Sequence, residues 1–206
     1  MPYWLLFLGC FLLFFSLLLF ITPLGQSLDF ELVMWLSRNR IDDLDQIARW
    51  LSFLGGTPCV LFFSALWCLH LAWYKNYTKI NFISLGLIGS IGLIWLLKVL
   101  IARPRPPEIY HLVASYGASF PSAHSGYAAA LVGLILLTRS SYSPYIVFFA
   151  MLWWVMMGSS RVYLGVHFPS DVLSGWGISF IWIALLYLLG KYFFHPKNKI
   201  LNKHLN

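Results

Sequence analysis

Charged residues are scarce in this chain of 206 residues, and acidic residues are the scarcest of all. Only 10% of the residues are charged, with seven acidic and fourteen basic, whereas 60% are hydrophobic. A soluble domain needs more polar side chains to cover its surface. The composition therefore excludes a soluble protein and indicates a chain embedded in a lipid bilayer.

Cysteine is also rare. The three cysteines, Cys10, Cys59 and Cys68, all lie within apolar stretches, where a thiol behaves as a small hydrophobic group. Their spacing shows neither a disulfide framework nor a metal-binding motif. The net charge of +7 does not indicate nucleic acid, because the basic residues sit at the ends of apolar segments. Anionic lipid is the expected partner, and no protein partner is inferred.

Six apolar stretches predict six membrane-spanning helices, since each crossing needs about 20 residues. They cover residues 4–22, 57–74, 80–101, 121–138, 144–158 and 171–194. The first stretch lacks both a basic segment before it and a small-residue cleavage site, so we expect an uncleaved helix rather than a signal peptide. We predict an all-α integral membrane protein whose residues 1–206 form a single domain, with six transmembrane helices in one bundle.

The segment between the first two spans, residues 27–54, is more polar and carries five of the seven acidic residues. Its apolar residues recur at helical spacing, which predicts one or two helices at the membrane interface.

The distribution of basic residues predicts the orientation in the membrane. If the first span starts inside, the inner segments hold Lys75, Lys79, Arg139, Lys191, Lys197, Lys199 and Lys203. This accumulation of basic residues in the inner segments favours both termini in the cytoplasm. Alternation of the spans then brings the ends of the third and fifth, and the starts of the fourth and sixth, to the outer face.

Three polar clusters lie at those span ends. They comprise Lys98 with Arg105-Pro106, then Pro121-Ser122-Ala123-His124, then Ser160-Arg161 with His167 and Asp171. Ionisable groups at membrane depth normally line a cavity or pair with one another. Together these residues supply three cations, two imidazoles and a carboxylate, which suit attack on a phosphate ester by a histidine nucleophile.

Phosphoryl transfer depends mainly on positioning and neutralising the negative charge of the transferred group. Lys98, Arg105 and Arg161 are the predicted phosphate-binding cations. Arg103 is a weaker candidate, with a lipid headgroup or a loop carbonyl as its alternative partners. Ser122 and Ala123 stand where a helix begins, so we expect their backbone N–H groups to face an anion. A simple helix cap is the alternative role of Ser122.

The two histidines have distinct predicted roles. His167 and Asp171 are four residues apart, and Pro169 prevents a continuous helix through His167. We predict a loop histidine oriented by a carboxylate, with its other ring nitrogen free to attack phosphorus. His124, in the first turn of its helix, is the predicted general acid that protonates the leaving oxygen.

These clusters resemble the three-part signature of the type 2 phosphatidic acid phosphatase (PAP2) family. Lys98 to Pro106 matches the first part, a Lys, six residues and Arg-Pro. Pro121 to His124 matches the second, Pro-Ser-Gly-His, except that Ala123 replaces glycine. Ser160 to Asp171 matches the third, Ser-Arg, five residues, His, three residues and Asp. The signature thus spans residues 98–171.

The resemblance implies a six-helix membrane bundle, a phosphohistidine intermediate, no metal or other cofactor, and an active site facing away from the cytoplasm. It assigns phosphate binding to Lys98, Arg105, Ser122, Ala123 and Arg161, proton donation to His124, and nucleophilic attack to His167 supported by Asp171. A methyl group at Ala123 is tolerable with helical dihedrals, so we expect a changed pocket rather than lost activity.

The expected function is that of a lipid phosphatase in a bacterial cytoplasmic membrane, acting on a phosphomonoester or diphosphate of a lipid carrier. Undecaprenyl diphosphate is the favoured substrate, while phosphatidylglycerophosphate, phosphatidic acid and the phosphates of lipid A stay open. A lipid phosphotransferase also stays open. A non-catalytic lipid-binding protein is disfavoured, because anion binding alone needs no pairing of His167 with Asp171.

Overall fold

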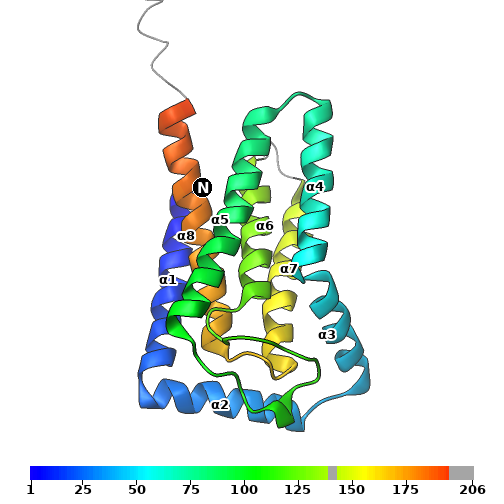
Figure 1. The fold of residues 1–206 in the computed structure, drawn as a ribbon, viewed down its shortest axis with the longest axis vertical. Coiled ribbons are helices and arrows are strands. Elements are labelled where there is room, and N and C mark those ends of the chain that lie inside the picture. Colours follow the sequence, from blue (N-terminus) through cyan, green and yellow to red (C-terminus); the bar gives the residue numbers. More distant parts are fainter. Residues whose placement is uncertain (139–142, 195–206) are drawn as a thin grey trace, which may run out of the picture.

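The computed structural model describes residues 1–138 and 143–194, without the side chains of residues 191–194, and all its regular elements are helical (Figure 1). They are α1 (Pro2–Ile21), α2 (Pro23–Arg38), α3 (Asp42–Leu54), α4 (Thr57–Trp73), α5 (Tyr77–Ile101), the 3-10 helix η1 (Glu108–Tyr110), α6 (Ala123–Thr138), α7 (Pro144–Tyr163) and α8 (Pro169–Phe194). Within the described ranges there is no strand, so the all-α prediction is confirmed.

Four helices, α1, α5, α7 and α8, are long and apolar enough to cross a membrane. A fifth candidate span is the pair α3 and α4, which is bent by 58° at the break between them. α6 has only 16 residues, yet almost all of it from Ser125 onward is buried among the other helices. The chain is therefore an integral membrane protein with four or five candidate spans around a short, buried central helix.

Glycines allow the central helices to approach closely. A Cβ at Gly175 of α8 would lie 3.0 Å from the backbone nitrogen of Gly126 on α6, and a Cβ at Gly177 would lie 2.8 Å from the carbonyl oxygen of Gly9 on α1. Contacts this short leave no room for a side chain, so glycine permits the packing. The first of them holds the start of α6 against the start of α8.

The segment after the first span folds into α2, which lies across one end of the bundle (Figure 1). The chain turns sharply because Thr22 is extended and accepts a hydrogen bond from the Gly25 backbone through its side chain, while Pro23 starts the new helix. α2 buries Gly25, Asp29 and Val33, which share one helical face. Residues 27–54 therefore do form two helices, although α3 joins α4 in a candidate span.

α7 extends five residues beyond its predicted end at Gly158. That glycine is not a stop signal: a Cβ there would collide with the Trp176 ring of α8, so its role is close helix packing. As a result Ser160 and Arg161 lie in the last turn of α7 rather than in a loop.

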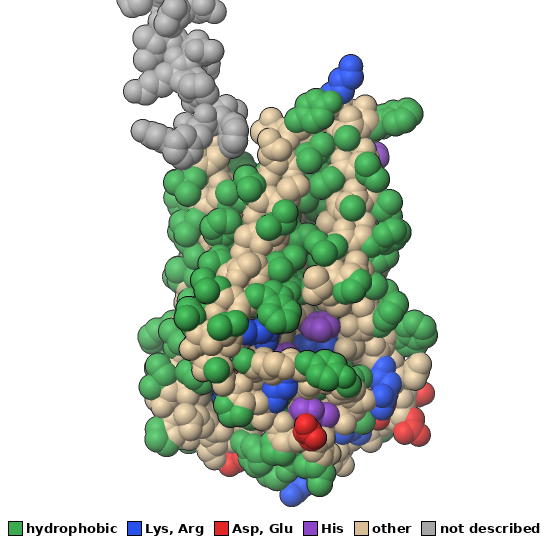
Figure 2. All heavy atoms as spheres, in the orientation of Figure 1, with side chains coloured by type: hydrophobic (Ala, Val, Ile, Leu, Met, Phe, Trp, Pro, Cys, Tyr) green, Lys and Arg blue, Asp and Glu red, His purple; other side chains and the backbone are tan. Residues whose placement is uncertain are grey.

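The ends of α5 and α7 and the starts of α6 and α8 all lie at the end of the bundle that α2 covers, away from the N-terminus (Figure 1). At this end, Figure 2 shows Lys, Arg and His side chains in a hollow between α4 and α5. Of the basic residues used to predict orientation, Arg139, Lys197, Lys199, Lys203 and the Lys191 side chain lie outside the described residues, so the orientation stays a prediction.

Candidate active site

His167 lies in the turn between α7 and α8, and its side chain is almost completely buried. The turn needs Gly165, whose φ of +75° favours glycine and whose Cβ would collide with the Tyr110 carbonyl. Pro169 then begins α8, so the chain is not helical at His167. This is the predicted loop placement of His167.

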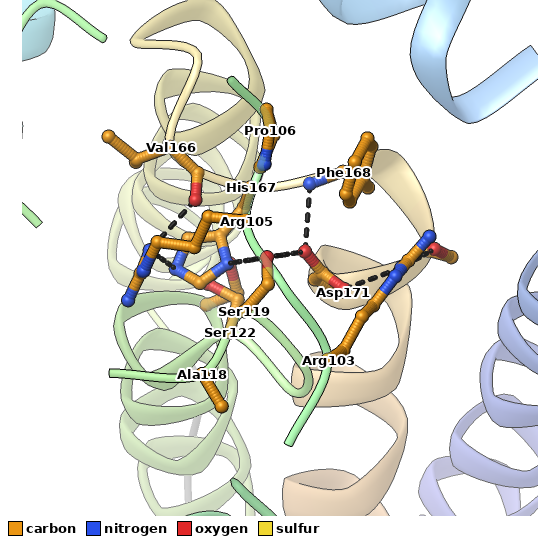
Figure 3. A network of polar contacts seen from close by, with 12 residues as sticks. Arg103, Arg105, Pro106, Ala118, Ser119, Ser122, Val166, His167, Phe168 and Asp171 are labelled. Carbon is orange, nitrogen blue, oxygen red and sulfur yellow. Dashed lines mark hydrogen bonds and ion pairs between the residues drawn. The ribbon is translucent and has the colours of Figure 1, made fainter. Parts of the chain in front are cut away.

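Asp171 fixes the orientation of the His167 ring (Figure 3). The Nδ1 atom of His167 lies 3.4 Å from Oδ2 of Asp171, which also accepts hydrogen bonds from the Phe168 backbone N–H and the Ser119 hydroxyl. An ionised carboxylate only accepts, so Nδ1 carries the proton and Nε2 keeps its lone pair. Nε2 lies 3.3 Å from Nη1 of Arg105, on the other side of the ring from Asp171.

The His167 ring is neutral at physiological pH. The pKa of His167 is lowered from 6.5 to about 4, mainly by burial and also by the charges of Arg105 and Lys98, against the opposing effect of Asp171. A nucleophilic nitrogen must be unprotonated, so this environment suits the predicted role.

Lys98 and Arg105 bring positive charge to the same place. The buried Nζ of Lys98 donates to the carbonyls of Ala118 at 2.6 Å and Ser119 at 3.3 Å. Arg105 donates to the carbonyls of Val166 at 2.8 Å, Gly117 at 2.9 Å and Tyr116 at 2.9 Å. The loop of residues 107–120 thus supplies carbonyl oxygens to both cations. The sequence indicates no role for this loop.

A second group of contacts centres on Ser52 of α3. Its carbonyl lies 3.1 Å from Nε2 of His124, and its hydroxyl accepts from Nη1 of Arg161 at 2.8 Å. Arg161 also donates to the Ser160 hydroxyl through Nε and Nη2, and it is 1% exposed. Arg161, Arg105 and His167 all act electrostatically on His124. The contacts around Ser52 and those around His167 therefore belong to one site.

Ser122 and Ala123 lie at the start of α6, as predicted. The backbone N–H of Ser122 already donates to the Asp171 carbonyl at 2.8 Å, and its hydroxyl accepts from Ser125 at 2.9 Å. The Ser122 N–H is therefore already paired, contrary to the expectation that it faces an anion. Ala123 is the first helical residue and does not have positive φ, so its methyl group causes no backbone strain.

Arg103 pairs with two carboxylates, a contact that the sequence did not predict. Its Nη1 donates to Oδ1 of Asp171 at 2.7 Å and its Nη2 donates to Oδ2 of Asp29 at 2.9 Å. Its guanidinium also stacks over the Phe168 ring, 4.2 Å from the ring centre. The two carboxylates thus occupy both terminal nitrogens of Arg103.

The sequence did not identify three residues of the site, which are Asp29, Ser52 and Ser119. None belongs to a recognisable motif, and Asp29 lies in a polar segment where a solvated carboxylate is the ordinary expectation. Among the described residues, no group of three or more His, Cys, Asp or Glu side chains is arranged to hold a metal ion.

Comparison with known proteins places these residues in context. A family model described as the PAP2 superfamily matches residues 79–194, which include all three polar clusters. The chain is 37% identical over 97 residues to phosphatidylglycerophosphatase B of Bacillus subtilis, which is 44% of this chain and 47% of that protein. It is 30% identical over 127 residues to lipid A 1-phosphatase of Rhizobium johnstonii, covering 57% of this chain and 48% of that protein. The matches thus span about half the length of these two relatives.

A third relative aligns over most of both chains. It is undecaprenyl-diphosphatase of Sulfolobus acidocaldarius, 28% identical over 194 residues, which is 89% of this chain and 88% of that protein. Among solved structures, the PAP2-type phosphatidylglycerolphosphate phosphatase of B. subtilis superposes with a TM-score of 0.77 at 25% identity, over 93% of this chain and 97% of that one. Aquifex aeolicus LpxE superposes with a TM-score of 0.66 at 25% identity, over 79% of this chain and 95% of that one.

Proposed function

Since the chain belongs to the PAP2 superfamily, a family of phosphatases, we propose that it hydrolyses a phosphomonoester or diphosphate of a membrane lipid through a phosphohistidine on His167. One observation carries the proposal. The His167 ring is held through Nδ1 by Asp171, while Nε2 faces Arg105 beside the buried Lys98.

The reaction proceeds in two steps. In the first, Nε2 of His167 attacks phosphorus, so that a P–N bond forms, the P–O bond to the lipid breaks, and His124 gives a proton to the departing oxygen. In the second, His124 takes a proton from water, whose oxygen displaces His167 and releases orthophosphate. The Ser52 carbonyl accepts from Nε2 of His124, so Nδ1 is the atom that exchanges these protons. His124 therefore enters the first step as an imidazolium, protonated on both nitrogens, and regains the Nδ1 proton from water in the second.

The charges of the site match those of the transferred group. Lys98, Arg105 and Arg161 offset the negative charge on the phosphoryl oxygens. Phosphorylated His167 is an imidazolium, and its positive charge is stabilised by Asp171, with Nδ1 and Oδ2 3.4 Å apart.

The proposed topology has six spans, with α3 and α4 as one broken span and the 16-residue α6 as another. Both termini lie in the cytoplasm and the site lies on the outer side, as the distribution of basic residues predicts. An apolar groove of about 540 Å³ lies between α4 and α5, lined by residues that include Leu61, Leu69, Ile83 and Leu87. These two helices also flank the hollow in which the cations are visible (Figure 2), so the lipid tail lies along them.

Undecaprenyl diphosphate is the first choice of substrate, because the undecaprenyl-diphosphatase relative aligns over most of both chains. Phosphatidylglycerophosphate is second, on the 37% identity and the superposition with the phosphatases of B. subtilis. Phosphatidic acid, lipid A phosphates and transfer to another lipid or sugar hydroxyl are the remaining alternatives.

A panel of purified lipids assayed in detergent tests the substrate. We expect undecaprenyl diphosphate to give a kcat/KM about tenfold or more above the other lipids, a factor equivalent to about 1.4 kcal/mol of transition-state stabilisation. The product is expected to be free orthophosphate, whereas a phosphorylated acceptor would indicate transfer. Equal rates on every lipid would contradict the choice of substrate but not the proposed phosphatase activity.

The pH dependence of kcat/KM tests the state of His167. Because the pKa of His167 is lowered to about 4, the nucleophile stays neutral down to that pH and is protonated only below it. The rate is corrected for ionisation of the substrate phosphate, which phosphorus NMR measures. As the pH is lowered, kcat/KM should then not fall near 6.5, where an ordinary histidine becomes protonated. A fall in kcat/KM as the pH drops through that value would show that His167 is not buried as described.

A further inference from the structure

We propose that Asp29 of α2 is a positioning residue for the reaction, which acts through Arg103 to leave Asp171 with the net negative charge that phosphorylated His167 requires. The role of Asp29 in the reaction rests on the proposed function. The contacts that link Asp29 to His167 do not depend on that function.

Asp29 is a buried carboxylate, 1% exposed, on α2, whose other acidic residue, Glu31, is exposed. Its Oδ1 accepts from the backbone N–H of Ser170 at 2.9 Å, and its Oδ2 accepts from the Ser170 hydroxyl and from Nη2 of Arg103. A charge buried to this extent persists only when it is paired and hydrogen-bonded. Asp29 therefore ties α2 to the turn that carries His167 and Asp171.

Arg103 links the two carboxylates. Its Nη2 binds Asp29, and its Nη1 binds Oδ1 of Asp171 at 2.7 Å and the Ser170 hydroxyl at 2.7 Å. The other oxygen of Asp171, Oδ2, faces Nδ1 of His167. The order Asp29, Arg103, Asp171, His167 is thus continuous, and only its last member meets the substrate.

The charges in this chain of contacts give Asp29 its role. If Asp171 were paired with Arg103 alone, the two charges would cancel, and little would remain to stabilise a positive imidazolium. Asp29 shares the guanidinium, so the set of two carboxylates and one arginine has a net charge of −1. This net negative charge lies on the Nδ1 side of the His167 ring, whereas Arg105 lies on the Nε2 side.

The groups that face His167 come from several elements. Arg105 and Lys98 act on it from the loop after α5 and from α5 itself, Asp171 acts from α8, and His124 lies within reach on α6. Arg161 of α7 acts on His124. Variants of Asp29 and Arg103 leave Lys98, Arg105 and Arg161 unchanged.

Three variants make the charge argument testable. Asp29→Asn leaves a net charge of zero on the set, Arg103→Gln leaves −2, and the double variant Asp29→Asn/Arg103→Gln restores −1. The pKa of His167 is read by NMR of the histidine-labelled protein in detergent, with the signal assigned from His167→Gln. This measurement needs no substrate.

We expect the pKa of His167 to fall by about one unit in Asp29→Asn, to rise by about one unit in Arg103→Gln, and to return close to the wild-type value in the double variant. Asp29→Asn should also lower kcat roughly tenfold, as loss of supporting contacts around a site commonly does, while KM stays within about twofold. Glu31→Gln is the matched control and should change neither quantity, because Glu31 lies on the exposed face of the same helix and its side chain accepts a hydrogen bond from the Ser27 hydroxyl.

The outcomes separate this proposal from the function on which it rests. A pKa of His167 that moves in the same direction in both single variants, or that stays constant, would overturn the role of Asp29 even if the wild type releases phosphate. The expected order of pKa values in a protein that releases no phosphate would uphold the linkage and refute the phosphatase proposal. If Asp29→Asn does not fold, Arg103→Gln is compared with the double variant. These two differ only in the Asp29 charge, so the proposal requires a lower pKa of His167 in the double variant.

Discussion

His167→Ala is expected to lower phosphate release by about 10⁴-fold or more, because a nucleophile that forms the covalent intermediate has no substitute in the site. No other imidazole is oriented by Asp171, whose contacts within the described residues include one histidine ring only, that of His167. The measurement is orthophosphate release from the preferred lipid in detergent. Trapping of an acid-labile phosphoenzyme, present in the wild type and absent in the variant, accompanies it.

His70→Ala is the matched control for this variant. His70 is exposed near the end of α4, at the opposite end of the bundle from the site, and makes an edge-to-face contact with Tyr74, with 5.1 Å between ring centres. Its removal should leave activity within about twofold, the usual consequence of a surface change. Phosphate release by His167→Ala at a rate close to that of His70→Ala would rule out the phosphohistidine mechanism.

His124→Ala is expected to lower the rate on lipid substrates by about 10² to 10⁴-fold, the range for loss of a general acid or base. The two steps should respond differently to the leaving group. An aryl phosphate, whose leaving oxygen needs no proton, should still phosphorylate His167 in the variant. Hydrolysis of the intermediate should stay slow, because His124 also activates the water.

The expected signature is therefore a burst. On rapid mixing with the aryl phosphate, His124→Ala should release one equivalent of phenol per enzyme and then turn over slowly, while the phosphoenzyme accumulates. If the variant loses the same factor on aryl and lipid phosphates and shows no burst, His124 does not act as the proton donor. Its contact with the Ser52 carbonyl would then be structural.

Much of the architecture was predictable because it depends on local patterns. Apolar stretches of about 20 residues define helices in a bilayer, and the described helices fall within a few residues of those predicted. The exception at Gly158 has a clear reason. A glycine that stops a helix and a glycine that lets another helix approach look the same in sequence, and only the Trp176 ring distinguishes them.

The pairing of His167 with Asp171 was equally predictable, since the two lie four residues apart around a proline that starts a helix. The contacts of Arg103 were not. Its sequence neighbour Arg105 turns toward His167 while Arg103 turns toward Asp29 and Asp171. Sequence spacing gives no sign of that divergence, because both residues lie in a loop without helical periodicity.

The sequence alone determined that this protein is membrane-embedded and helical and which motif residues lie at the span ends, because hydrophobic length and local spacing fix these properties within a turn or two of the chain. Only the tertiary structure decided which partners complete the site. Asp29 reaches Ser170 across 141 residues of sequence and Ser52 reaches Arg161 across 109. Contacts of this kind depend on the angles at which whole helices pack, which no local pattern encodes.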